Sequence, residues 1–218
     1  MKVHKYGDYD EYVREQSTAN KLKLHSVWAS PTELEIISRH VEQTIPNASF
    51  GICHGVRNGW EVQWLRDRLK IDIIGTELAE TATNYPHVIQ WDFHNTKEEW
   101  IGHCDIIYSN AWDHSYDPET CLDKWMSCLK PTGRCFIEWS EEASSEIDRV
   151  DCFGASKDEC LQLISKKFDI EKVYSVPFTW REVVKRLFKL GKLRVEWRVA
   201  RRVVFVVKHR NASDKSKS

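Results

Sequence analysis

The sequence predicts an α/β domain in which a mostly parallel sheet is doubly wound between two layers of helices. Short apolar runs of strand length alternate with stretches of helical periodicity, and runs such as Cys104 to Ser109 are continuous, as in strands covered on both faces. Near the carboxyl end, the β-branched run Val203 to Val207 favours one more strand, antiparallel beside 170–176. A chain of 218 residues can bury one full core, so we expect a single domain.

The first predicted helix begins at Pro31 and runs to about Pro46. Ser30 and Glu33 have the spacing of a capping box, and apolar residues recur behind them at helical intervals. The elements that follow in the first half are expected in this order: a strand over 49–53, a helix over 58–70, a strand over 71–76, a short helix over 78–83 and a short strand over 87–90.

The second half continues the alternation from the strand Cys104 to Ser109. Pro118 begins a helix that extends to Leu129, and the residues after it turn the chain into another strand. The remaining elements are expected in this order: a strand over 134–139, a helix over 156–168, a strand over 170–176 and a β-rich stretch over 194–208. The domain is therefore expected over 31–208, after an N-terminal extension over 1–30 and before a disordered tail over 209–218.

Composition places the chain among soluble globular proteins. Hydrophobic residues make up 41% and charged residues 30%, which excludes disorder and fibrous repeats. The sequence has no signal-like apolar stretch and no apolar run long enough to span a bilayer, so we expect a cytoplasmic protein. The cysteines form no CxxC pair, and neighbours such as Cys53 and His54 would point to opposite faces of a strand. Reduced thiols and no metal site are therefore expected.

Four polar clusters stand directly after four predicted strands. They are the bend GICHGVRNGW over 51–60, the acid Glu77, the pair Asp92 and Phe93, and the run SNAWDH over 109–114. Because the carboxyl ends of parallel strands meet at one edge of a sheet, the clusters should converge on one crevice. A carboxylate there can accept two ribose hydroxyls, and an acid beside a ring suits an adenine. We therefore expect an adenosine-containing ligand.

The glycine spacing helps to distinguish a nicotinamide dinucleotide from other adenosine-containing ligands. Gly51, Gly55 and Gly59 recur at every fourth residue, which does not meet the GxGxxG pattern of dinucleotide enzymes. A nicotinamide-dependent oxidoreductase shares the sheet and the acid after the second strand, so it stays open as a rival, disfavoured by this spacing.

Taken in order, GICHGVRNGWEV, GTELAET, QWDFHN, CDIIYSNAWDHSYDP and LKPTGRCFIEW resemble the motifs of class I S-adenosylmethionine-dependent methyltransferases. The resemblance is clearest over 50–139 and leaves the first 30 residues unmatched. It implies a seven-stranded Rossmann-like sheet with an antiparallel last strand, and S-adenosyl-L-methionine as the cofactor. It also implies these cofactor contacts: Gly51, Cys53, His54 and Gly55 at the methionine end, Glu77 at the ribose, Asp92 and Phe93 at the adenine, and Ser109 and Asn110 facing the methyl group.

The chain departs from the family pattern at two positions. Gly51 stands where the family has an acidic residue, and Cys53 stands where a glycine is common. The ammonium of the cofactor would then rely on backbone carbonyls or on another carboxylate. A methyltransferase-like subunit that binds a partner without turnover is the alternative that these departures keep open.

Catalysis is assigned to the fourth cluster. Methyl transfer to a hydroxyl needs alignment and a base, and we expect His114 to be that base, with Asp113 orienting it or binding substrate. The alternative is that both residues only brace the loop. Residues 110–113 read NAWD rather than NPPY, which disfavours bases in nucleic acid. A looser likeness of DHSYDP to bacterial enzymes of saccharide synthesis favours a small-molecule or saccharide hydroxyl.

The basic surplus lies near the carboxyl end, over 181–202. The stretch 180–194 combines an apolar stripe with flanking lysines and arginines, which is typical either of a helix packed on the sheet with a solvated basic face or of a surface for an anionic acceptor or a membrane. Both interpretations stay open, as does the oligomeric state.

Overall fold

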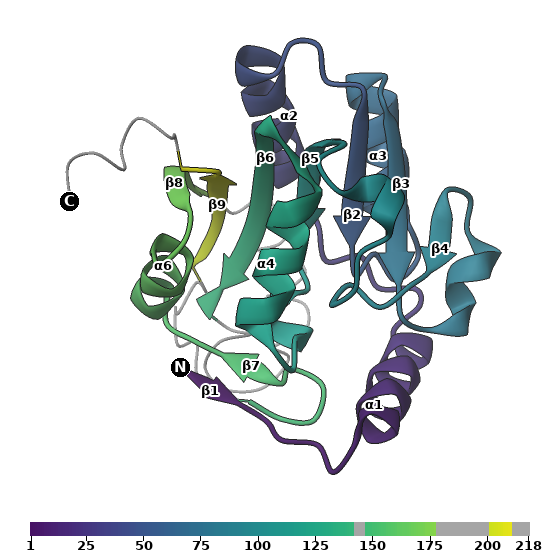
Figure 1. Ribbon diagram of the computed structural model, residues 1–218. Helices are drawn as coiled ribbons and strands as arrows, with labels where there is room; N and C mark the ends of the chain where they lie inside the picture. Colours follow the sequence, from purple (N-terminus) through teal and green to yellow (C-terminus); the bar gives the residue numbers. More distant parts are fainter. Residues whose placement is uncertain (142–146, 178–200, 211–218) are drawn as a thin grey trace, which may run out of the picture.

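A computed structural model describes residues 1–141, 147–177 and 201–210. Its central sheet has seven strands: β2 (Phe50–His54), β3 (Asp72–Glu77), β4 (Val88–Gln90), β5 (Cys104–Ser109), β6 (Leu129–Ser140), β8 (Asp169–Ser175) and β9 (Arg202–Lys208). In space they follow the order β4-β3-β2-β5-β6-β9-β8 (Figure 1). Neighbouring pairs from β4 to β6 are parallel, and β9 lies antiparallel between β6 and β8. The mostly parallel sheet with an antiparallel last strand is thus confirmed.

Helices cover both faces of the sheet. They are α1 (Tyr9–Leu22), α2 (Pro31–Thr44), α3 (Trp60–Leu69), α4 (Pro118–Cys128) and α6 (Lys157–Ser165). Apolar residues of α2 and α3, among them Leu34 and Leu65, form one buried cluster with the sheet. Residues of α4 and α6, among them Trp125 and Ile164, form a second cluster on the opposite face. Because strands β2 and β5 contribute to both clusters, they read as continuous apolar runs in the sequence.

The helix starts have capping residues, and the predicted cap at Ser30 is confirmed. The hydroxyl of Ser30 accepts a hydrogen bond from the backbone N–H of Glu33, so α2 begins at Pro31. Asp117 caps α4 in the same way. Ser156 forms a complete capping box at the start of α6. These local signals fix where each helix leaves the sheet edge.

Two predicted elements differ from the structure. Strand β6 begins at Leu129 rather than at residue 134, because Leu129 pairs with Cys104 before the register shifts and Arg134 pairs with Ile106. The residues expected to turn therefore form an irregular start of the strand. The helix expected over 78–83 is a 3₁₀ helix, Glu80–Asn84. The basic stretch 180–194 and residues 211–218 of the predicted tail lie outside the described residues.

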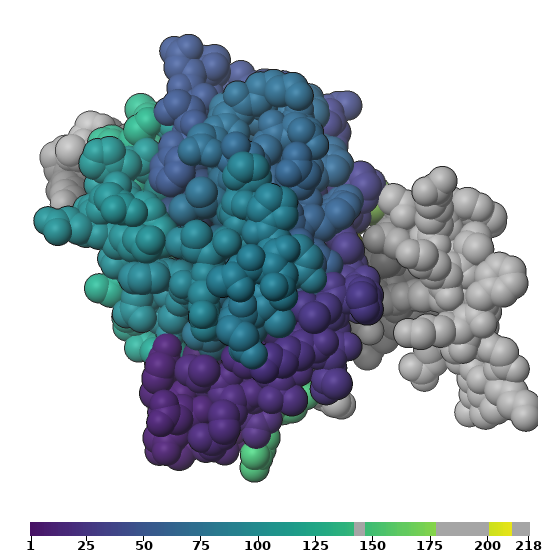
Figure 2. Space-filling model, turned by 90° about the vertical axis from the view of Figure 1, so that its right-hand side faces the viewer, coloured from purple at the N-terminus to yellow at the C-terminus, as the bar shows by residue number. Residues whose placement is uncertain are grey.

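The N-terminal 30 residues are joined to the domain. Strand β1 (Lys2–Val3) pairs antiparallel with β7 (Phe153–Gly154), and Asp8 caps α1. Figure 1 shows α1 below the ends of β2 and β3. The space-filling view shows the N-terminal segment, in purple, packed against one end of the molecule (Figure 2).

All seven cysteines are buried and free. Within the described residues, no helix combines the length and the apolar character needed to cross a membrane.

Candidate functional site

Two adjoining cavities lie where the parallel strands end. The first cavity, between α1 and the ends of β3 and β4, is lined by Tyr12, Gly55, Glu77, Asp92, Phe93 and Ala111 among others. The second cavity, of about 340 Å³, is lined by Trp28, Gly55, Glu61, Asn110, Asp113 and His114 among others. Gly55 and His114 line both. The four sequence clusters do converge on one crevice of the sheet edge.

The glycine bend after β2 brings backbone close to both cavities. Gly55 has a φ of +73°, and a Cβ there would lie 2.4 Å from the Cβ of Ala111. Gly59, with a φ of +70°, occupies the N-cap position of α3. Both positions need glycine, because a side chain would be strained or would clash. The bend therefore forms a close-fitting backbone cradle that leads into the first turn of α3.

Glu77 at the end of β3 is tied to this bend. Its Oε2 accepts a hydrogen bond from the backbone N–H of Arg57 at 2.8 Å, and its Oε1 accepts one from Ala79 at 3.2 Å. Burial raises the pKa of Glu77, and these backbone donors oppose the rise. A carboxylate offers about four acceptor positions, so each oxygen can still accept a hydroxyl from the cavity.

Asp92 and Phe93 line the first cavity, but Asp92 already has protein partners. The hydroxyl of Tyr9 donates to its Oδ2 at 2.7 Å, and the backbone and ring nitrogens of His94 donate to its Oδ1 at 2.9 and 2.7 Å. Burial alone would raise the pKa of Asp92, but the hydrogen bonds from His94 and Tyr9 outweigh it and lower the pKa. The adenine position expected at Asp92 is thus shared with a side chain of α1.

Four of the expected cofactor contacts line neither cavity. Gly51 and Cys53 are buried within β2. Ser109 is buried, and its hydroxyl accepts from the N–H of Ala111 and donates to the carbonyl of His54, so it braces the end of β5. His54 stacks on the ring of Trp125, and burial lowers its pKa to about 3. The structure does not bring these side chains to either cavity.

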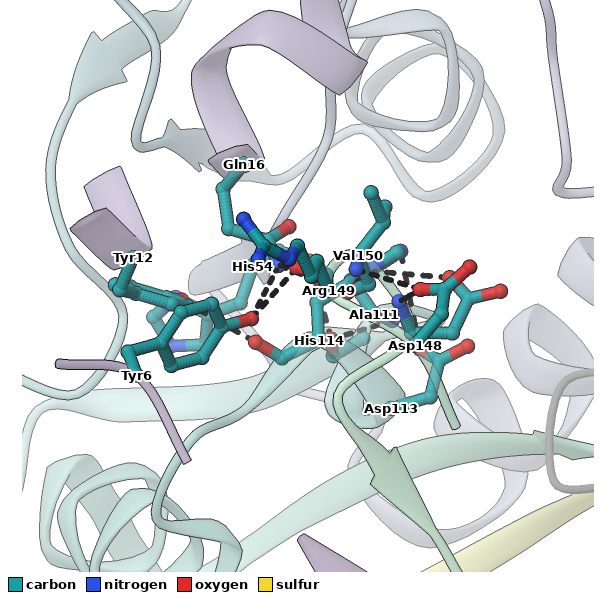
Figure 3. A network of polar contacts seen from close by, with 12 residues as sticks. Tyr6, Tyr12, Gln16, His54, Ala111, Asp113, His114, Asp148, Arg149 and Val150 are labelled. Atoms are coloured by element: carbon teal, nitrogen blue, oxygen red, sulfur yellow. Dashed lines mark hydrogen bonds and ion pairs between the residues drawn. The ribbon is translucent and has the colours of Figure 1, made fainter. Parts of the chain in front are cut away.

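His114 is held between two loops at the junction of the cavities (Figure 3). Its Nδ1 lies 2.7 Å from the carbonyl oxygen of Val150, which also accepts a hydrogen bond from Gln16 of α1 at 2.8 Å. A carbonyl can only accept, so Nδ1 carries the proton and Nε2 keeps its lone pair. Nε2 lies 4.0 Å from Oδ1 of Asp113. The arrangement presents an oriented basic nitrogen to the second cavity.

Asp113 and Asp151 flank His114 on its two sides. Desolvation raises the pKa of Asp113, whereas the charge of His114 opposes the rise. The Oδ1 atom of Asp151 lies 3.5 Å from Nδ1 of His114. Although no metal site is expected from the sequence, these three residues offer one ligand atom each within 4.8 Å of one another. We interpret the group as the surroundings of a base, in which the hydrogen bond of Nδ1 to the Val150 carbonyl leaves Nε2 as the acceptor nitrogen.

Comparison with known proteins gives no match from sequence and several from structure. No family model and no curated protein matches the chain. A 1,6-didemethyltoxoflavin-N1-methyltransferase from Burkholderia thailandensis, solved with S-adenosylhomocysteine, superposes with a TM-score of 0.68 at 12% identity, covering 95% of this chain and 93% of that one. The chain has the fold of class I S-adenosylmethionine-dependent methyltransferases.

Further structures with this methyltransferase fold act on other acceptors. A geranyl diphosphate C-methyltransferase from Streptomyces coelicolor A3(2) superposes with a TM-score of 0.66 at 10% identity, covering 91% of this chain and 98% of that one. The N-methyltransferase NodS from Bradyrhizobium japonicum WM9 gives 0.60 at 11% identity, covering 90% and 100%. Both were solved with S-adenosylhomocysteine. At these identities the likeness establishes the fold, and the acceptor atom differs among the neighbours.

Reasoning from sequence missed α1 as part of the site. Tyr12 and Gln16 line the first cavity and Tyr9 binds Asp92. A signal was present, because Asp8 stands before a first turn that contains Glu11, and its carboxylate accepts from the N–H of that residue. Glu61 was missed as well, since nothing in the sequence says which face of α3 its carboxyl takes.

Proposed function

We propose that the protein is an S-adenosylmethionine-dependent methyltransferase that methylates a hydroxyl of a small-molecule or saccharide acceptor. The observation that carries the proposal is the meeting of Glu77 with the Gly55 bend at the first cavity. They lie 22 residues apart in the sequence, yet the N–H of Arg57 within the bend donates to Glu77. This pairing of an acid with a glycine bend suits an adenosyl group.

The residues present fit the cofactor. The backbone at Gly55 is close enough to Ala111 that a Cβ would fill the space. Glu77 would hold the ribose hydroxyls, and Phe93 would contact the adenine. When bound, S-adenosylmethionine supplies an electrophilic methyl group on sulfur. The protein's task is then to align the acceptor with that methyl group and to remove the acceptor's proton.

His114 is suited to take up the proton of the acceptor hydroxyl. In this tautomer Nε2 has a lone pair, and His114 lines both cavities, so an acceptor hydroxyl in the second cavity can donate its proton there as the new oxygen–carbon bond forms. Asp113, 4.0 Å from Nε2, stabilises the imidazolium that results. Proton removal of this kind typically contributes about 10²- to 10⁴-fold to a rate.

The lining of the second cavity supports a hydroxyl-bearing acceptor. The acidic residues Glu61, Asp113 and Asp151 line it together with Lys23 and Arg57. Carboxylates such as those of Asp113 and Asp151 accept hydrogen bonds from hydroxyls. The solved neighbours named for 1,6-didemethyltoxoflavin and for geranyl diphosphate support a small-molecule acceptor.

Calorimetry tests the cofactor first. Titration with S-adenosylhomocysteine should give saturable binding, and titration with NAD should give none. The reverse preference would replace the proposal by an oxidoreductase. Methyl transfer from labelled S-adenosylmethionine to a panel of monosaccharides and phenols then tests the acceptor class. If the protein binds the cofactor but methylates only amines, the hydroxyl assignment is wrong while the methyltransferase assignment stands.

A further inference from the structure

Position 51 in β2 has no room for the acid that the family pattern places there. A Cβ on Gly51 would lie 2.4 Å from Cγ1 of Ile106 and 3.2 Å from its carbonyl oxygen. Ile106 is buried in β5, which pairs with β2 at Gly51. The neighbouring strand therefore occupies the space of the missing side chain. A cofactor of this class still carries an α-ammonium, which needs a counter-charge when water is excluded.

Glu61 brings a carboxyl group to this region from another element. It lies in the first turn of α3, two residues after Gly59, and only 6% of it is exposed. Glu61 lines the second cavity together with Gly55 and Asn110. Its charge acts on Cys53 at the end of β2 and on Tyr108 of β5. The carboxyl thus lies beside the same two strands that close around position 51.

This carboxyl group has no partner from another residue among those the structure describes. It accepts a hydrogen bond from its own backbone N–H, and Arg57 favours its charge, but Glu33 and Glu77 oppose it. Burial is the largest effect and raises the pKa of Glu61 to about 8. A buried carboxyl that forms no ion pair is costly to ionise unless a ligand places a cation directly against it.

We propose that the carboxylate of Glu61 binds the α-ammonium of S-adenosylmethionine and of S-adenosylhomocysteine, in place of the acid absent from position 51. The role rests on the proposed function. The counter-ion of the α-ammonium would then lie at the start of α3 instead of in β2, on the other side of the glycine bend. The bend then lies between two carboxylates: Glu77 for the ribose and Glu61 for the amino group.

Two ligands that differ in the ammonium test the role. S-adenosylhomocysteine carries the amino-acid end, whereas 5′-methylthioadenosine has the same adenosyl thioether without it. For Glu61→Gln, calorimetry should show an affinity for S-adenosylhomocysteine that is lower by about 10- to 100-fold, the loss of a hydrogen bond to a charged group. The affinity for 5′-methylthioadenosine should change less than about 2-fold. Glu80→Gln removes an exposed carboxylate that pairs with Lys21 outside both cavities, and should leave both affinities within about 3-fold.

The outcomes separate this role from the proposed function. If the unaltered protein binds neither ligand, the proposed function is wrong and the role of Glu61 falls with it. If it binds both and Glu61→Gln weakens both equally, or neither, the cofactor assignment survives and the role of Glu61 is overturned. Should Glu61→Gln fail to fold by circular dichroism, Glu61→Asp gives the same test. It keeps the charge but shortens the reach, and should weaken only S-adenosylhomocysteine.

Discussion

The hydroxyl of Tyr9 donates a hydrogen bond to Oδ2 of Asp92 across 2.7 Å. The two residues are 83 positions apart and join α1 to the segment after β4. Tyr12, one turn later on α1, packs edge to face against His94, which binds the other oxygen of Asp92. The carboxylate of Asp92 thus holds α1 against the first cavity. The same carboxylate is proposed to accept a hydrogen bond from the adenine amino group.

Tyr9→Phe should raise the affinity for S-adenosylhomocysteine by about 2- to 10-fold. The substitution removes a donor that competes for Oδ2 of Asp92, and a hydrogen bond of this kind is worth about 0.5–1.5 kcal/mol. Calorimetry measures the change. Tyr6→Phe is the matched control, because the Tyr6 hydroxyl donates to the carbonyl of Arg149 rather than to Asp92. A weaker affinity in Tyr9→Phe would show that Tyr9 belongs to the binding site itself.

Glu77→Gln should weaken S-adenosylhomocysteine and 5′-methylthioadenosine together, by about 10- to 100-fold. Both ligands carry the ribose, and an amide in place of the carboxylate loses charge-assisted acceptance of its hydroxyls. The equal effect distinguishes Glu77 from Glu61, whose substitution should affect one ligand only. Retention of both affinities within about 2-fold would mean that Glu77 only supports the bend through Arg57 and Ala79.

His114→Gln should lower kcat for a hydroxyl acceptor by about 10²- to 10⁴-fold, because the amide cannot take up the proton. Gln can still donate to the carbonyl of Val150, so the loop contact that Nδ1 makes over 2.7 Å need not be lost. The rate is measured with an acceptor on which the unaltered protein turns over. The Kd for S-adenosylhomocysteine should stay within about 3-fold. Full turnover in His114→Gln would leave His114 a bracing role alone.

The sheet was predictable because its signals are local. Continuous apolar runs such as Cys104–Ser109 and capping residues such as Ser30 act within one element, and the structure places both as expected. The convergence of Gly55 and Glu77 followed from the parallel order of strands, which brings their ends to one edge.

Contacts between distant segments were not predictable in this way. Whether the carboxylate of Asp92 already accepts a hydrogen bond from the protein depends on where α1 packs. The presence of a tyrosine at position 9 does not indicate that packing. Gly51 and Cys53 stand at positions where the family binds the cofactor, but Ile106 packs where a side chain at 51 would be, and Cys53 is buried. Side-chain direction and long-range packing, rather than element order, decided which expected residues reach a cavity.

Arg202→Gln should destabilise the protein by about 3–5 kcal/mol. Arg202 of β9 forms ion pairs with Glu33 of α2 and with Glu138 of β6, two buried carboxyl groups whose pKa values are raised by burial. Removing the cation leaves buried carboxyls that must be neutralised or left unpaired. Denaturant unfolding measures the loss. The exposed neighbour, in Arg201→Gln, should change stability by less than about 0.5 kcal/mol, and an equally small change for Arg202→Gln would contradict the role of the cluster.

Binding of S-adenosylhomocysteine should release close to one proton at pH 7. In the free protein the pKa of Glu61 is raised to about 8, mainly by burial, so the group is largely protonated, and pairing with the ammonium ionises it. The affinity should therefore rise as the pH increases from about 6 to about 8. Calorimetry in buffers of different ionisation enthalpy counts the protons, and 5′-methylthioadenosine should release fewer.

The raised pKa of Glu61 has the opposite effect on the stability of the ligand-free protein, which should fall as the pH increases. An acid whose pKa is raised on folding contributes stability below its usual value of 4.5, and this stability is lost as the pH rises through about 8. Without ligand, the free energy of unfolding should therefore fall across this window by more in the unaltered protein than in Glu61→Gln. Saturating S-adenosylhomocysteine should remove this fall, because Glu61 is then ionised in both the bound and the unfolded protein across the window. Parallel pH profiles for the two proteins, with and without ligand, would show that Glu61 does not titrate with the cofactor.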